Sequence, residues 1–332
     1  MLNEISKYLL KENDLFISLT GNVGRVGLLD KCFLPAALNQ RVACLRIKNN
    51  SILDKRYLFY LMNTDKFEMD CVYSSKGIAQ KNMSTEWLKE YDILIPPLTI
   101  QQQLVNLLKK LDFLITKQKM QIIKLDLLVK SRFVEMFGDP VANPMGWKKI
   151  PLGELGELNR GISKHRPRNA PELMGGDYPL IQTGEISEAD LYVTDYSTTY
   201  SEIGFRQSKM WPKGTLCITI AANIAKTAIL NFDTCFPDSV VGFISGARTN
   251  QLFIHFWFSF FQKMLEEQAP ESAQKNINLQ ILRRLEVILP PLSLQKEFAE
   301  FVQQTDKSKF VMQKGLEKLE MSYKALVQQY FG

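Results

Sequence analysis

Two histidines, His165 and His255, are the only imidazoles in the chain, and neither belongs to a catalytic or metal-binding pattern. His255 lies inside the apolar stretch LFIHFWF, which favours a partly buried helix residue over a metal ligand. The sequence contains no HExxH, no paired CxxC and no GxxxxGK[ST], the spacings used by zinc hydrolases, zinc fingers and P-loops. We therefore expect no catalytic residue, no metal and no cofactor.

The glycine-rich segment GNVGRVG, residues 21–27, is the stretch that could cradle a phosphate. A second copy, residues 222–228, reads ANIAKTA, in which an alanine takes the place of each glycine. A phosphate loop that needs the backbone freedom of glycine would not accept this exchange, so we predict a structural turn. Both copies keep an asparagine and a basic residue as candidate DNA contacts, Asn22 with Arg25 and Asn223 with Lys226.

A basic segment, NRGISKHRPR at residues 159–168, contains no acidic residue. Lysine and arginine bind phosphates, and arginine, lysine and amide side chains also read base edges. The alternative is a basic loop that only faces solvent. The candidate DNA contacts here are Arg160, Lys164, His165, Arg166 and Arg168, followed by Gln182, Thr183 and Lys209.

The tetrapeptide AQKN occurs at residues 79–82 and again at 273–276, a separation of 194. Its lysine and asparagine could contact DNA, or the asparagine could cap the helix expected directly after it. A residue that is the same in both copies suits phosphate binding better than base reading. The candidates are Lys81, Asn82, Lys275 and Asn276.

The same separation of 194 relates other motifs, so the chain contains an internal repeat. The matching pairs are Pro96-Pro97-Leu98 with Pro290-Pro291-Leu292, and Phe137-Gly138 with Phe331-Gly332. Residues 58–138 align with 252–332 without a gap, and residues 15–30 align with 216–231 at a separation of 201. Each aligned upstream segment begins as an alternating apolar strand.

A long stretch after each Pro-Pro-Leu carries apolar residues at alternating spacings of three and four, which predicts a coiled coil. The predicted seam residues are Leu104, Leu108, Leu111, Ile115, Ile122, Leu125 and Val129 in the first copy, and Phe298, Val302, Met312, Leu316, Leu319 and Tyr323 in the second. Two such helices in one chain would pair with each other. The alternative is two ordinary amphipathic core helices.

This arrangement resembles the specificity (S) subunits of type I restriction–modification systems. The resemblance covers essentially the whole chain. The segments that carry it are IPPLTIQQQL (95–104), LPPLSLQKEF (289–298), FGDPVANPMGW (137–147), WKKIPLGELGELNRGIS (147–163) and YPLIQTGEI (178–186). It implies an α+β (mixed α/β) fold with two similar DNA-recognition domains, each followed by a long helix, the two helices pairing as an antiparallel, pseudo-twofold coiled coil.

The resemblance implies a non-catalytic DNA-binding subunit that reads a split motif in double-stranded DNA. Methyltransferase (modification) subunits and a restriction subunit would dock on it. The expected domains are a first recognition domain (1–99), a spacer helix (100–138), a linker (139–146), a second recognition domain (147–293) and a C-terminal spacer helix (294–332). The first recognition domain is about 54 residues shorter than the second at its start. Other interpretations are a coiled-coil protein adaptor, a stand-alone enzyme, or the product of a defective or silent specificity cassette.

The overall composition fits these interpretations. The chain has 332 residues, a formal net charge of +6 and a pI near 8.9, which permits a nucleic-acid partner without requiring one. Five cysteines without paired spacing fit a reducing compartment. The first residues do not form a signal peptide, and the apolar run 251–261 is too short to span a bilayer. We therefore predict a cytoplasmic protein without a membrane partner.

Overall fold

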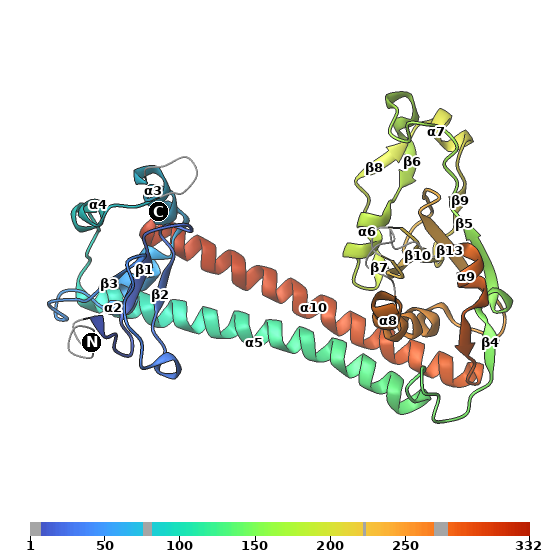
Figure 1. Cartoon of the computed structure of the whole chain (residues 1–332), viewed down its shortest axis with the longest axis horizontal. Coiled ribbons are helices and arrows are strands. Elements are labelled where there is room, and N and C mark those ends of the chain that lie inside the picture. Colours follow the sequence, from blue (N-terminus) through green and yellow to red (C-terminus); the bar gives the residue numbers. More distant parts are fainter. Residues whose placement is uncertain (1–7, 76–81, 222–223, 269–277) are drawn as a thin grey trace. The chain divides into compact units, whose positions relative to one another are not determined.

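The computed structural model describes residues 8–75, 82–221, 224–268 and 278–332. Its internal contacts divide the chain into two compact units. Unit 1 contains residues 1–122 and 311–332, and unit 2 contains residues 123–310. Each unit combines strands with helices (Figure 1), so the predicted α+β class is confirmed.

Unit 1 contains a small antiparallel sheet of order β2-β1-β3, with helices along the chain after it. The side chains of β1 alternate between buried and half-buried, as the strand pattern LFIS predicts. Each helix begins with a polar cap, and Asp54, for example, accepts hydrogen bonds from the amides of Arg56 and Tyr57. The elements are β1 (Leu15–Ser18), β2 (Val26–Leu28), β3 (Val42–Leu45), α2 (Lys55–Met62), α3 (Asp65–Ser74) and α4 (Thr85–Glu90).

Unit 2 contains three sheets, of order β5-β13-β10-β11-β7, β8-β6-β12-β9 and β14-β4. The strands are β4 (Lys149–Pro151), β5 (Gly156–Arg160), β6 (Met174–Leu180), β7 (Tyr192–Val193), β8 (Thr198–Tyr200), β9 (Met210–Trp211), β10 (Leu216–Thr219), β11 (Thr227–Leu230), β12 (Thr234–Cys235), β13 (Val240–Ser245) and β14 (Glu286–Ile288). The shorter helices are α6 (Thr183–Glu188), α7 (Glu202–Arg206), α8 (Gln251–Gln268) and α9 (Leu279–Arg284). Among them, α8 lies against the five-stranded sheet (Figure 1).

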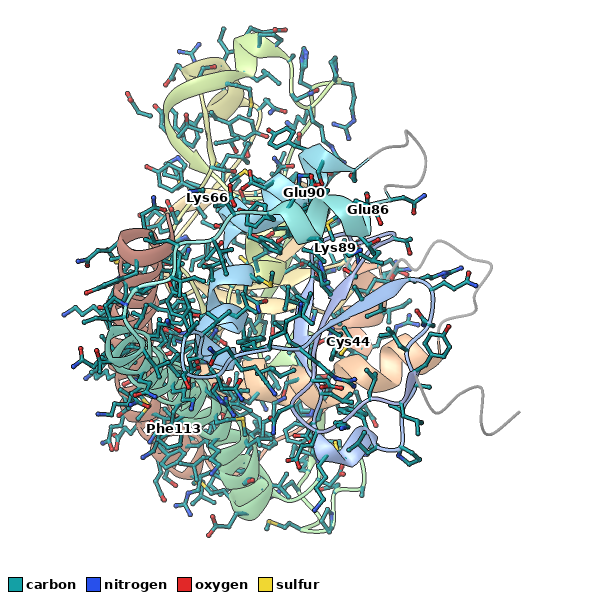
Figure 2. All side chains as sticks on the ribbon, turned by 90° about the vertical axis from the view of Figure 1, so that its left-hand side faces the viewer. Cys44, Lys66, Glu86, Lys89, Glu90 and Phe113 are labelled. Atoms are coloured by element: carbon teal, nitrogen blue, oxygen red, sulfur yellow. The ribbon has the colours of Figure 1, made fainter. Side chains whose placement is uncertain are left out.

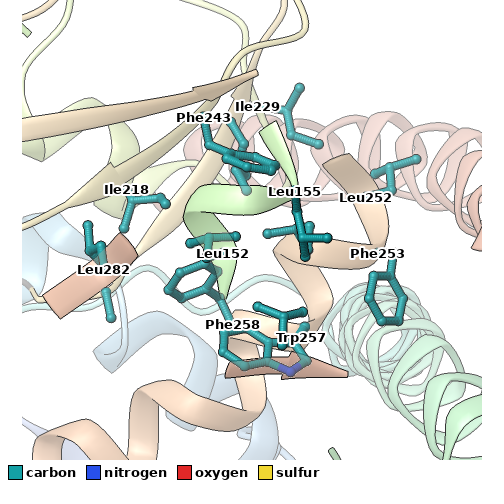
Figure 3. Packing of buried hydrophobic residues seen from close by; sticks show 14 of the residues in the cluster. Leu152, Leu155, Ile218, Ile229, Phe243, Leu252, Phe253, Trp257, Phe258 and Leu282 are labelled. Carbon is teal, nitrogen blue, oxygen red and sulfur yellow. The ribbon is translucent and has the colours of Figure 1, made fainter. Parts of the chain in front are cut away.

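The core of unit 2 lies between this sheet and α8. Figure 3 shows Leu152, which begins a short 3-10 helix after β4, and Leu155, which follows that helix, between the sheet residue Phe243 and the α8 residues Trp257 and Phe258. All five side chains are at most 1% exposed. The apolar run that was too short for a membrane span is therefore the first part of α8, most of whose side chains are buried in a globular core.

Two helices of 40 residues each, α5 (Leu98–Phe137) and α10 (Leu292–Phe331), follow the Pro-Pro motifs. Each is about 60 Å long at 1.5 Å per residue. Within unit 2, Lys309 Nζ lies 2.5 Å from Asp126 Oδ1, and Arg132 Nη2 lies 3.0 Å from Glu297 Oε1. Residue numbers thus rise along α5 as they fall along α10, so the segments run antiparallel.

Every predicted seam residue is buried or half-buried on these helices. In unit 1, Leu104 and Leu108 of α5 share a core with Phe331 of α10. In unit 2, Phe298 and Val302 of α10 share a core with α5. The spacing of three and four therefore marks the faces that the helices bury against each other and against the sheets.

The repeat is visible in a buried hydrogen-bond pattern. Gln101 Oε1 accepts from the amide of Asp54, and Gln295 Oε1 accepts from the amide of Asn250. Both glutamines also donate to the carbonyl of the first proline of the Pro-Pro motif, Pro96 or Pro290. The glutamines are 194 residues apart, but their amide partners, which lie just before the ungapped alignment begins, are 196 apart. Because α2 and α8 continue from these partners, Leu58 corresponds in the structure to Ile254, two residues beyond its partner in the alignment.

Candidate nucleic-acid interface

The basic segment 159–168 forms the end of β5 and a loop that is fixed to the region after α7. Gln207 Oε1 accepts two backbone hydrogen bonds, from Lys164 at 2.5 Å and from His165 at 2.9 Å. Ser208 Oγ donates to the carbonyl of Ile162 at 2.9 Å. The loop backbone is therefore held by side chains more than 40 residues away in the sequence, and the basic side chains project from a defined frame.

Three arginines of this loop converge on one aspartate, Asp238. Arg160 Nε donates to the Asp238 carbonyl at 2.8 Å, Arg166 Nη2 lies 3.4 Å from its Oδ2, and Arg168 Nη2 donates to its Oδ1. The loop also packs closely on this segment, because a Cβ on Gly161 would lie 2.3 Å from the Phe236 carbonyl oxygen. The cluster brings Arg160, Arg166 and Arg168 together, as expected from their proximity in sequence.

The basic loop is not free of acidic neighbours, although its own sequence contains none. Asp238 pairs with Arg166 and Arg168, and Glu172 Oε1 lies 3.6 Å from His165 Nε2. Both carboxylates come from other parts of the chain, so the local charge is lower than the segment alone indicates. Lys164 remains an exposed basic side chain on the loop.

The other predicted contacts in unit 2 lie on different elements. Gln182 precedes α6, where its backbone N–H donates to Glu185 Oε2 at 3.0 Å, and Thr183 is the first residue of that helix. Lys209 Nζ lies 4.1 Å from the ring centroid of buried Trp211, a cation–π contact that engages the ammonium group of this exposed lysine. Gln182 therefore has a structural role at a helix start in addition to any contact with DNA.

The described parts of the two strand–turn segments share one hydrogen bond and one backbone feature. Ser18 Oγ accepts from the amide of Arg25 at 3.1 Å, and Thr219 Oγ1 accepts from the amide of Lys226 at 3.1 Å. In each copy the residue before the basic one has positive φ, +85° at Gly24 and +57° at Ala225. Alanine therefore does occupy the left-handed position, and the argument that the exchange rules out positive φ is wrong.

The space around the turn explains why the first copy has glycine where the second has alanine. A Cβ on Gly24 would lie 2.7 Å from Cys71 Cβ, whereas Ala225 carries its methyl in the same turn. The basic residues of the turns differ in environment as well. Asn22 and Arg25 are exposed, while Lys226 is half-buried. Asn223 lies outside the described residues.

Most of the repeated AQKN motif lies outside the residues that the structure describes, including Lys81, Lys275 and Asn276. Asn82 is described, and it forms an isolated antiparallel β-bridge with Thr20, two residues after the end of β1. The helices that follow are capped by Ser84 and Asn278, whose side chains accept from Glu86 and Ile281. The alternative that Asn82 caps the next helix is therefore wrong, because Ser84 holds that position.

A cavity of about 290 Å³ lies inside unit 2, on the side of α8 that carries His255. His255 is 9% exposed, and its Nδ1 lies 3.0 Å from Thr227 Oγ1. Burial lowers the pKa of His255 to about 4, against the opposite pull of the Asp190 carboxylate. Lys226, a predicted DNA contact, is half-buried and lines this open cavity together with Asp190, so it does not belong to the basic loop.

Nothing among the described residues groups three or more histidine, cysteine or carboxylate side chains as a metal site. In the same part of the chain, no helix is both long and apolar enough to cross a membrane. Two functional candidates that the sequence did not reveal are Asp238 and Gln207. Both are distant in sequence from the loop they organise, and no local pattern distinguishes them from other surface residues.

The fold and the site together define a repeated α+β protein with long paired helix segments and a braced basic loop. The chain belongs to the family described as the type I restriction modification DNA specificity domain, which matches residues 1–125 and 144–321. The relatives that it resembles are named specificity subunits of type I restriction enzymes.

Two curated relatives illustrate the match. The MjaVIII specificity subunit of Methanocaldococcus jannaschii is 32% identical over 130 residues, which cover 37% of this chain and 30% of that protein. The EcoBI specificity subunit of Escherichia coli is 23% identical over 329 residues, which cover 90% of this chain and 67% of that protein. This chain thus spans less than a third of the first relative and about two thirds of the second.

Solved structures share the fold. The S subunit of the type I restriction–modification system of M. genitalium superposes with a TM-score of 0.65 at 16% identity, covering 98% of this chain and 84% of that one. A structure described as the basis of complex assembly and conformational transition of a type I system gives 0.61 at 18% identity, covering 97% and 82%. At these identities the similarity establishes the architecture and not the DNA sequence read.

Proposed function

We propose that this chain is the DNA sequence-specificity subunit of a type I restriction–modification complex and has no active site of its own. The observation that carries the proposal is the duplicated DNA-specificity fold. The same strand–turn segment and the same buried glutamine occur in both units. Two related recognition domains suit a split DNA motif, in which each domain reads one half.

The domain organisation is part of this proposal. Recognition domain 1 is assigned to residues 1–99 and recognition domain 2 to residues 147–293. The spacer helices are assigned to residues 100–138 and 294–332, with a linker at 139–146. Helix α5 at Leu98–Phe137 and helix α10 at Leu292–Phe331 support these limits to within two residues.

The DNA contacts of the second domain are assigned to the basic loop, with Lys164 free to meet a phosphate. Lys209 and Thr183 remain candidates on neighbouring elements. In unit 1, exposed Asn22, Arg25 and Asn82 are the described candidates. Phosphate contacts would supply most of the affinity, and they would make binding depend steeply on salt.

The partners belong to the proposal as well. Modification subunits would dock along the paired helices and methylate the DNA that this chain selects, and a restriction subunit would join the same complex. Such a complex acts on the cell's own DNA, so we assign the chain to the cytoplasm. The absence of a membrane-spanning helix among the described residues is compatible with this assignment.

Co-purification with the host's modification subunit, followed by sequencing of methylated DNA, tests the function directly. We expect a stable complex and a methylated motif made of two short halves with a fixed gap. A mutant lacking this chain in the same host is the matched control, and its DNA should lack that motif. A stable complex that methylates no motif would contradict DNA specificity and favour the protein-adaptor interpretation. Failure to form any complex would contradict the docking role.

A further inference from the structure

Asp238 contacts three arginines of the basic loop, and it binds them through two different groups. Its carbonyl accepts from Arg160, whereas its carboxylate faces Arg166 and Arg168. The side chain of Asp238 is 29% exposed, and those of Arg166 and Arg168 are 56% and 45% exposed. All of these groups belong to unit 2, and the cluster remains open to an incoming ligand.

Arg166 has most of its donors committed within the protein. Its Nη1 donates to the carbonyls of Ser163 at 2.7 Å and His165 at 2.8 Å, and its Nη2 lies near Asp238. These bonds tie the loop to itself. A guanidinium has five N–H donors in a rigid fork, so Arg166 can offer little of that fork to DNA.

Arg168 differs because the only hydrogen bond in which the described structure engages it is that from Nη2 to Asp238 Oδ1. Its other donors remain for a ligand, while the carboxylate restricts where the side chain points. An arginine held in this way loses less conformational entropy on binding than a free surface side chain.

The charge of Asp238 decides which part of the DNA this arginine meets. A carboxylate next to the guanidinium would face the negative charge of any phosphate bound there, so the pair is poorly suited to the backbone. A base edge carries no net charge. Guanine presents two acceptors, O6 and N7, in the major groove, and a bidentate arginine contact to them is the commonest specific contact.

We propose that Arg168 reads a guanine in the half-motif of the second recognition domain and that Asp238 is the positioning residue that holds it there. Arg166 stabilises the loop, and Lys164 meets a phosphate. This inference rests on the proposed function, because it names the base that one residue of the DNA site would recognise.

The test uses the full chain in complex with its modification subunit. Binding is measured on duplexes that carry the methylated motif, on duplexes with each G·C pair of that motif replaced in turn, and on unrelated DNA. The variants are Arg168→Ala, Arg168→Lys, Asp238→Asn and Lys164→Ala. Arg168→Lys keeps the charge and removes the fork, so it separates base reading from simple attraction.

We expect both Arg168 variants to lose about fivefold or more of the discrimination at one G·C pair and to keep it at the others. Asp238→Asn should lose discrimination at the same pair while binding unrelated DNA more tightly, because a negative charge near the backbone is removed. A purely structural aspartate would instead change binding to every duplex alike and leave the discrimination at that pair intact. Lys164→Ala should weaken binding to all duplexes alike and reduce the salt dependence.

If Arg168→Ala keeps its discrimination at every G·C pair, while the wild-type complex prefers its motif, this inference is overturned and the proposed function is not. Equal weakening of Arg168→Ala on all duplexes would assign Arg168 to a phosphate and also overturn it. If the wild-type complex shows no preference for any motif, the proposed function fails as well. The outcomes therefore separate the two claims.

Discussion

A buried glutamine fixes the start of each long helix to the globular part of its unit. Gln101 is fully buried, accepts from the amide of Asp54 at 2.8 Å, and donates to the carbonyls of Ile52 and Pro96. Gln295 makes the corresponding bonds in unit 2. A side chain that satisfies three backbone groups in the interior is hard to replace, because each orphaned group keeps its desolvation penalty.

Gln101→Leu should therefore lower the free energy of unfolding by on the order of 3 kcal/mol. Leucine has a similar volume but cannot satisfy the three backbone groups. Thermal unfolding of the full chain measures the change. Gln102→Leu is the matched control, because it makes the same substitution at an exposed position one residue later. Equal melting temperatures for the two variants would contradict the structural role of Gln101.

The residue scale also shows what a sequence can and cannot predict. The repeat located both glutamines in matched segments, yet nothing in the spacing indicated which amide each one accepts from. Arg168 is 70 residues from Asp238, and Lys164 is 43 residues from Gln207. Such pairings depend on how strands are ordered in a sheet, and side-chain periodicity within one element carries no information about that order.

At the scale of elements, periodicity was sufficient for the long helices because their burial repeats every few residues. The short strands and the 3-10 turns of unit 2 carry too few residues for a periodic signal. The alignment also missed the two-residue shift between α2 and α8, because the two units have different helices in this segment. Helix α2 ends at Met62 and α3 begins at Asp65, whereas α8 continues unbroken from Gln251 to Gln268.

Helix α8 carries a buried titratable group, and this predicts a pH dependence of stability. The pKa of His255 is about 4 in the folded chain, below the ordinary value near 6.5, so the unfolded chain binds the proton more readily. The contribution of neutral His255 to the free energy of unfolding should thus be complete above pH 6.5 and be lost as the pH falls towards 4. The loss is on the order of 3 kcal/mol.

His255→Gln should remove most of the pH dependence in this window, measured by chemical unfolding at a series of pH values. Asp190, Asp306, Lys226 and Lys309 line the same cavity and are retained in the variant. His165→Gln is the control, because it removes the other histidine, which is exposed. If His255→Gln retains the full decline between pH 6.5 and 4, the assignment to His255 is incorrect.

Helix α5 has a second apolar row, away from its seam. Its members are spaced by seven and are each more than 40% exposed: Phe113, Met120, Leu127 and Val134. Figure 2 shows Phe113 projecting from α5. The corresponding positions of α10 are Lys307, Lys314, Met321 and Gln328, which are mostly polar. A row with heptad spacing fits a partner helix, so we propose that α5 contributes more than α10 to docking the modification subunit.

Met120→Glu should therefore reduce co-purification of the modification subunit by about tenfold or more, since a charge in an apolar contact is costly. Lys314→Glu changes the equivalent exposed position of α10 and should have a smaller effect. The circular dichroism of both variants should match the wild type. Full retention of the partner by Met120→Glu would exclude this row as the dock.

At the scale of the whole molecule, each long helix begins in one unit and ends in the other. The core of unit 2 includes Phe133 and Phe137 from the end of α5 and Phe298 from the start of α10. Phe133 packs with ring centroids 5.5 Å from Phe253 and 5.4 Å from Phe298. In unit 1, Phe331 lies 5.3 Å from Tyr57, the counterpart of the pair formed by Phe137 and Phe253 at 5.0 Å.

Because the long helices contribute core residues to unit 2, the structure predicts which fragment of the chain folds alone. Residues 147–293, the extent expected for the second recognition domain alone, lack every α5 aromatic and Phe298. We expect residues 123–310 to unfold cooperatively and residues 147–293 to have little cooperative structure, as measured by thermal circular dichroism. Phe133→Ala within the longer fragment should cost about 3–5 kcal/mol, because it leaves a cavity among four aromatic rings. A cooperative transition of equal midpoint in both fragments would mean that the helices contribute only docking surface and not core.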